Sequence, residues 1–164
     1  MLKKCLVSMA MIGFLASAAL AAQEFPYEKE QIGQLRLGLS AQAVRQIIPG
    51  KPALGPDQLM GADGLFHQDW KYSQAGISLD MTSEKKGGPK SIASITVTAP
   101  SKLKTQRGVG IGSGADAVAK AYGPFRNKED SRPERFVAGS NFGGVIFIFK
   151  QGKVDSIFIG AAAE

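Results

Sequence analysis

Apolar and polar residues alternate along six stretches of the chain, so that residues two apart share the same character. A period of two is typical of β-strands with one buried face. The stretches are residues 66–72, 77–81 and 91–98 in the first half, and residues 135–138, 145–150 and 153–160 in the second half. The sequence therefore predicts three strands in each half.

Two shorter stretches carry apolar residues at helical spacing. The first includes Val44 and Ile48 and follows Ser40, a residue type that caps helix N-termini. The second includes Val118 and Tyr122. Proline and glycine directly follow both stretches and end both predicted helices.

The two halves also repeat each other in sequence. With an offset of 74 residues, Leu37 corresponds to Ile111, Gly38 to Gly112 and Val44 to Val118. We therefore expect one duplicated unit, at residues 32–98 and 108–164, with a linker at residues 99–107 and a flexible N-terminal arm at residues 23–31.

The expected fold class is α+β with two tandem repeats. Each repeat would be a short helix, or a helical pair, packed on one face of a small antiparallel sheet of three to four strands. The helices are too short to be stable alone and need this surface. The other face of each sheet would be open.

Residues 1–22 have the pattern of a secretory signal peptide. Lys3 and Lys4 precede an apolar run that ends in small residues at a processing site. A spanning helix is the alternative, but the run is short and no stop-transfer pattern follows it. The single cysteine, Cys5, lies far from the cleavage site and is not placed to accept a lipid. We expect a periplasmic or secreted protein without a membrane span after cleavage.

Charge narrows the choice of partner only a little. Loss of Lys3 and Lys4 with the signal peptide lowers the net charge from +6 to +4. A surplus of this size favours acidic partners weakly, and no basic, aromatic groove for nucleic acid is evident.

No cofactor is expected either, because the glycine-rich residues 108–114 lack the lysine of a phosphate-binding loop.

Alternation assigns the residues of the open faces. If Leu79 points into the core, its neighbour Asp80 points out, and the duplication places Ile146, Ile148 and Phe158 on the same outward side. Exposed apolar residues of this size usually mark a contact. Either a partner or a second copy covers them, or the arm, the linker or the other half does.

A hairpin turn at residues 73–76 would set Asp69 opposite Asp80, with His67 diagonal to them. Two like charges across a ladder destabilise it unless a cation intervenes. Three interpretations stay open. Lys71 compensates the charge, or His67, Asp69 and Asp80 hold a divalent ion, or the carboxylates receive a basic group of a partner.

Catalytic sets are not evident in the sequence. A nucleophilic triad would have to use His67, the only histidine, and no serine lies in a nucleophile-elbow motif. Asp69 and Asp80, directly opposed, would lie too close together for the usual pair of glycosidase carboxylates. We therefore expect a protein that is not an enzyme.

Two motifs carry a resemblance to known families. They are LGLS at residues 37–40 followed by Val44, and RGVGIG at residues 107–112 followed by Val118. In these the chain resembles the beta-lactamase inhibitory protein family and the outer-membrane assembly lipoproteins called SmpA or BamE. The resemblance implies helices on one face of an antiparallel sheet and a binding role. The chain departs from the lipoproteins in having two copies and no lipid-acceptor cysteine, and the inhibitory contact residues of the other family match no position here.

The expected function is that of an exported, non-catalytic module that binds a protein partner in the cell envelope. Its leading version is an inhibitor or immunity-type partner of an envelope hydrolase. The alternatives are a periplasmic or outer-membrane assembly accessory and a small-ligand or metal-binding module. The candidate contact residues are His67, Asp69, Asp80, Ile146, Ile148 and Phe158.

Overall fold

The structure is a computed structural model that describes residues 25–162. The predicted signal peptide and the first two residues of the predicted arm lie outside the described residues. Within them, the chain forms two α-helices and ten strands, some of only two residues. None of the described helices has the length and apolar character needed to cross a membrane.

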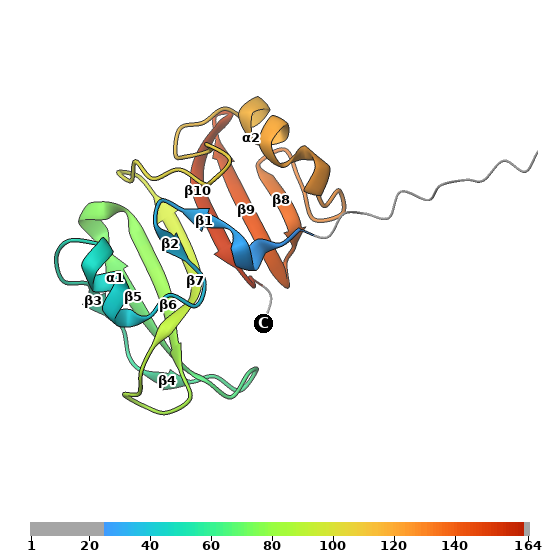
Figure 1. Cartoon of the computed structure of the whole chain (residues 1–164). Coiled ribbons are helices and arrows are strands. Elements are labelled where there is room, and N and C mark those ends of the chain that lie inside the picture. Colours follow the sequence, from blue (N-terminus) through green and yellow to red (C-terminus); the bar gives the residue numbers. More distant parts are fainter. Residues whose placement is uncertain (1–24, 163–164) are drawn as a thin grey trace, which may run out of the picture.

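One eight-stranded sheet runs through the whole molecule (Figure 1). Its strands follow the order β3-β5-β6-β7-β10-β9-β8, with β4 also pairing β5. The strands of the sheet are β3 (Ala53–Leu54), β4 (Gln58–Leu59), β5 (Phe66–Tyr72), β6 (Ile77–Ser83), β7 (Ser91–Thr98), β8 (Arg135–Ser140), β9 (Gly143–Lys150) and β10 (Lys153–Gly160).

The expected α+β class with two separate small sheets is wrong. The protein is mostly β, with 43% strand and 17% helix, and the sheet is continuous. The halves join because β7 pairs with β10, placing Val97 opposite Ile157 and Ile95 opposite Ile159. This pairing removes two exposed strand edges and brings the apolar faces of both halves into one core.

The predicted register of the first hairpin is confirmed. Tyr72 lies opposite Ile77, Trp70 opposite Leu79, and Asp69 opposite Asp80. A short 3-10 turn, η2 (Ser73–Ala75), joins β5 to β6. Because the register is as predicted, Asp69 and Asp80 lie on the face opposite to the buried Trp70 and Leu79.

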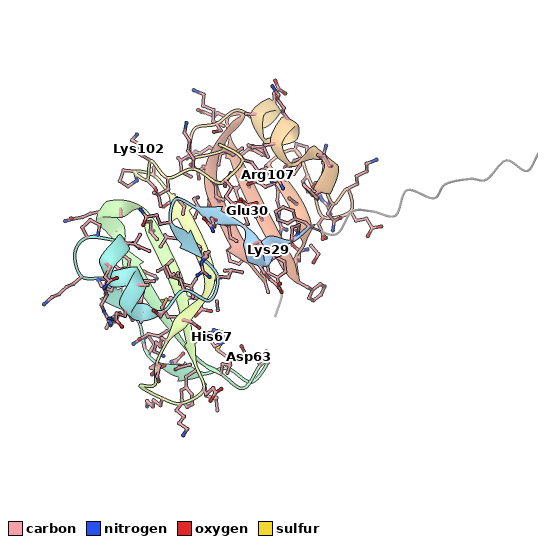
Figure 2. The ribbon with its side chains drawn as sticks, viewed as in Figure 1. Lys29, Glu30, Asp63, His67, Lys102 and Arg107 are labelled. Atoms are coloured by element: carbon pink, nitrogen blue, oxygen red, sulfur yellow. The ribbon has the colours of Figure 1, made fainter. Side chains whose placement is uncertain are left out.

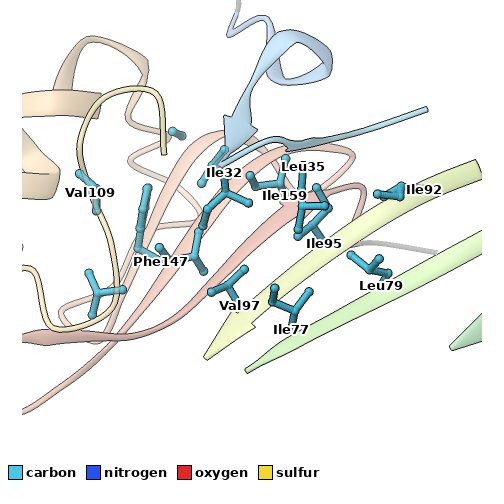
Figure 3. Close-up of a cluster of buried hydrophobic side chains, with 14 of the residues drawn as sticks. Ile32, Leu35, Ile77, Leu79, Ile92, Ile95, Val97, Val109, Phe147 and Ile159 are labelled. Carbon is cyan, nitrogen blue, oxygen red and sulfur yellow. The ribbon is translucent and has the colours of Figure 1, made fainter. Parts of the chain in front are cut away.

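Both helices and a small hairpin cover one face of the sheet (Figure 1). They are α1 (Ala41–Ile47), α2 (Ala115–Tyr122) and the hairpin of β1 (Gln31–Ile32) and β2 (Leu35–Arg36). Ser40 caps α1 as predicted, its Oγ accepting from the Ala43 amide at 3.3 Å. Figure 3 shows the hairpin residues Ile32 and Leu35 over the sheet residues Ile95 and Ile159. All of these apolar side chains belong to one hydrophobic cluster.

Residues 25–31 are packed against the second half of the chain, where the sequence suggested a flexible arm. They include the 3-10 turn η1 (Tyr27–Lys29). Phe25 is buried in the core cluster, and the Tyr27 ring lies directly on Gly143, where any Cβ would collide with it. The Arg107 guanidinium carbon lies 4.9 Å from the Phe125 ring centre, where the turn η3 (Gly123–Phe125) follows α2, and 5.4 Å from that of Tyr122.

Short segments lie along the two outermost long strands of the sheet, β5 and β8. The short strands β3 and β4 lie along β5, and between them the Gly55 amide donates to the Asp69 carbonyl at 2.8 Å. At the other border the segment at residues 126–132 runs beside β8. There the Asn127 amide donates to the Val137 carbonyl at 2.8 Å.

Candidate functional site

A groove lies on the face of the sheet that the helices leave uncovered. It consists of two adjoining cavities of about 430 and 400 Å³. The two cavities share Met60, His67, Asp80, Ser94 and Ala161. The groove extends from the β4–β5 loop across β5, β6 and β7 to the end of β10, so it lies where the two halves of the sheet meet. We call it the open-face groove.

Four of the six predicted contact residues line this groove. Asp69 and Phe158 line the first cavity, in addition to His67 and Asp80, which line both. They come together because they lie on alternate positions of neighbouring strands, all pointing away from the core. Ile146 and Ile148, the other two candidates, are not among the lining residues.

His67 lies between two carboxylates (Figure 2 labels His67 and Asp63). Its Nδ1 is 2.7 Å from Oδ2 of Asp80, on the neighbouring strand, and its Nε2 is 2.9 Å from Oδ2 of Asp63, in the β4–β5 loop. Both ring nitrogens are therefore held by carboxylates. In this arrangement both ring nitrogens face carboxylates, and neither is presented to a hydroxyl group.

The contact between His67 and Asp63 shifts the pKa of both groups. Burial alone would lower the pKa of His67, but the hydrogen bonds and charges of Asp63 and Asp80 outweigh it and raise the pKa above its ordinary value of 6.5. The pKa of Asp63 is lowered by the hydrogen bond from the Leu65 amide and by the one from His67. Both shifts favour the charged pair.

Asp69 and Asp80 lie directly opposite each other but have different partners. Asp80 turns to His67, whereas Asp69 Oδ2 lies 3.6 Å from Nζ of Lys71. Both side chains of the Asp69–Lys71 pair are mostly exposed, so this ion pair adds little stability. Among residues 25–162 no group of three or more His, Cys, Asp or Glu is arranged to hold a metal ion. The trio of His67, Asp69 and Asp80, one of the three open interpretations, does not form such a group.

The apolar candidates divide into covered and accessible residues. Ile146 is buried, as is its cross-strand neighbour Val137, although neither belongs to the main core cluster. On the same strand face, Arg135 Nη2 donates to Oδ1 of Asn141 at 2.6 Å. Ile146 is therefore covered within the chain, whereas Ile148 is 37% exposed.

Several residues of the groove were missed from the sequence, among them Met60, Asp63 and Phe142. Met60 and Asp63 belong to the β4–β5 loop, which the sequence indicated only as part of a long connection. Phe142, in the β8–β9 turn, is 78% exposed and lines the second cavity. The Asp63-Gly64 pair is a turn signal that could have indicated a hairpin ending at His67.

Comparison with known proteins gives no further guide to this site. The chain matches no protein-family model, no curated protein and no solved structure.

Proposed function

We propose that this chain is an exported, non-catalytic protein that binds a protein partner in the cell envelope through the open-face groove. The observation that carries the proposal is the groove itself. It gathers His67, Asp69, Asp80 and Phe158 on the one face of the sheet that no helix covers. A binding role also fits His67, whose two ring nitrogens are both held by carboxylates.

The groove suits a partner that presents a basic side chain beside apolar surface. Asp63, Asp69 and Asp80 make this region acidic, whereas the chain as a whole carries a net charge of +6. The exposed ring of Phe142 and the ring of Phe158 provide apolar surface beside these carboxylates. Aromatic side chains around a desolvated charge are typical of the residues that contribute most to binding energy.

An envelope hydrolase that this chain inhibits, or against which it protects, is the first partner to test. Co-purification with outer-membrane complexes, without any inhibited enzyme, would instead indicate an assembly accessory.

Site-directed photocrosslinking in intact cells tests the proposal. A photoreactive residue replaces Gln58, which lines the groove, or Lys120, which is an exposed residue of α2. The helix α2 lies on the opposite side of the sheet from the groove. We expect a protein adduct from position 58 and none of the same mass from position 120. Mass spectrometry identifies the partner, which is then purified.

Matched charge variants test the contact with the purified partner. Asp69→Lys should weaken binding at least tenfold, because it places a cation where the partner's cation would bind, an effect of about 1.4 kcal/mol or more. Asp116→Lys, the same change on α2, should alter affinity less than twofold. Equal adducts from both positions, or equal affinity of both variants, would show that the groove is not the binding surface.

A further inference from the structure

His67 joins two parts of the chain that the sheet connects only loosely. Asp80 lies on β6, within the sheet, whereas Asp63 lies near the tip of the six-residue loop at residues 60–65. This loop follows β4, a strand of only two residues. In the pairing of β4 with β5, Gln58 lies opposite His67 and Leu59 opposite Phe66. The base of the loop is closed by backbone hydrogen bonds, from the Met60 amide to the Leu65 carbonyl at 2.8 Å and from the Gly64 amide to the Met60 carbonyl at 3.1 Å. Beyond this closed base, the Asp63–His67 contact joins the loop tip to a side chain of β5.

The two contacts of His67 are not equivalent. The Asp80 contact is the shorter, 2.7 Å against 2.9 Å, and the Asp80 side chain is 25% exposed whereas that of Asp63 is 43% exposed. A protonated imidazole donates from both nitrogens, but a neutral imidazole donates from one only. We assign the proton of the neutral ring to Nδ1, because Nδ1 faces the less exposed carboxylate at the shorter distance, so that Nε2 presents a lone pair to Asp63.

We infer that the loop at residues 60–65 is a proton-controlled lid over the open-face groove, held closed by doubly hydrogen-bonded His67 and released when His67 loses its proton. The loop can act in this way because Met60, Ala62 and Asp63 form one wall of the second cavity. Phe142 and Ala161 also line this cavity. Moving the loop tip therefore changes the width of the groove without disturbing the sheet.

The charged groups around His67 determine the direction of the response. Asp80 faces it from β6, Asp63 from the loop, and Asp69 lies two residues along β5 on the same face. Asp63 and Asp80 favour the imidazolium, whereas the charge of Asp69 is offset by Lys71, the next outward residue of β5. Because the pKa of His67 is raised, the closed loop is fully held below 6.5 and is released as the pH rises through the folded-state pKa.

Acid releases the loop by a different route. The pKa of Asp63 is lowered from 3.8, so its contribution is present above pH 3.8 and is lost as the pH falls through the lowered value. The lid is therefore expected to be closed between about pH 4 and pH 6.5. It should open as the pH rises through the raised pKa of His67 or falls through the lowered pKa of Asp63.

Nuclear magnetic resonance of the free protein tests this inference, so its outcome does not depend on a partner being found. His67 is the only histidine, and its ring signals can be followed without assignment ambiguity. We expect a pKa above 6.5, lowered by Asp63→Asn and almost unchanged by Asp69→Asn, which removes a nearby charge without a hydrogen bond to the ring.

Backbone order parameters of Gly64 and Leu65 report the loop directly. They should fall from the value of a rigid backbone, about 0.85, to below about 0.6 across the titration of His67. In His67→Gln they should show no change between pH 5.5 and pH 8.5, since glutamine does not titrate. A His67 pKa at or below 6.5, a loop equally ordered on both sides of the titration, or the same pH response in His67→Gln would overturn the inference.

Discussion

Arg107 attaches the N-terminal residues to the rest of the molecule. Its guanidinium is stacked among the rings of Phe25, Tyr122 and Phe125, and its Nε lies 3.7 Å from Oε2 of Glu30. The Glu30 side chain is only 4% exposed, and its second oxygen, Oε1, has no hydrogen-bond partner among the described residues. Arg107 is thus the main compensation for a buried carboxylate (Figure 2).

Replacing Arg107 should therefore lower the free energy of unfolding by more than is usual for a partly exposed residue. We expect Arg107→Ala to lower the free energy of unfolding by about 3 kcal/mol, because it leaves the charge of Glu30 buried and unpaired. The change is measured by urea denaturation. Lys104→Ala, an exposed change on the same linker, is the control and should have almost no effect. Glu30→Gln in the Arg107→Ala background should recover part of the loss, and failure to do so would contradict this explanation.

Residue by residue, the sequence predicted the site where local geometry determined it. The opposition of Asp69 and Asp80 followed from one tight turn and the alternation of Trp70 and Leu79 around it. The contact between His67 and Asp63 could not be predicted in this way, because it depends on a loop without periodicity. The covering of Ile146 also depends on contacts that alternation does not reveal.

At the scale of elements, the two helices differ in how they begin. Ser40 caps α1 with its side chain, whereas α2 begins after Gly114, which has no side chain to cap the helix. Gly114 has a φ of −72°, which any residue can adopt, and a Cβ at this position would contact nothing within 4 Å. A serine therefore fits there without strain.

Substitutions at the two N-cap positions should change the free energy of unfolding in opposite directions. Ser40→Ala should lower the free energy of unfolding by about 1 kcal/mol, because the Ala43 amide loses its acceptor. Gly114→Ser should raise it by about 0.5 kcal/mol, through the new cap and the reduced freedom of the unfolded chain. Thermal unfolding of both variants measures the effects. A destabilised Gly114→Ser would show that the helix start is constrained by something other than capping.

The longer elements were predictable and the shortest were not. The predicted bounds of β5, β7 and β10 are those observed, because each strand alternates over its whole length. The strand β9 begins two residues before the prediction, at Gly143 and Gly144, which have no side chains to show a pattern. The strands β1 to β4 have two residues each, too few for any period to be detected.

At the scale of the whole molecule, the pairing of β7 with β10 joins the two halves into one structural unit. Alternation showed which residues of these strands face the core, but it cannot show which strands are neighbours. The sequence repeat suggested two units, each complete in itself. The structure instead shares one hydrophobic cluster between residues from both halves.

The protein should therefore unfold in one cooperative transition. Trp70, the only tryptophan, reports the first half, whereas Val145 is fully buried in β9 of the second half. Val145→Ala should lower the free energy of unfolding by about 2 kcal/mol, and the Trp70 fluorescence midpoint should shift as far as the circular-dichroism midpoint. The exposed change Lys150→Ala is the control. An unchanged fluorescence midpoint in Val145→Ala would mean that the halves unfold separately.

The occupied borders of the sheet have a consequence for behaviour at high concentration. Fibrils and open-ended oligomers grow when an edge strand of one molecule has unpaired backbone groups with which a strand of the next molecule can pair. Here β3 and β4 on one side, and residues 126–132 on the other, already use much of that hydrogen-bonding capacity. The long strands β5 and β8 therefore offer less free backbone to a second molecule than bare border strands of the same length would.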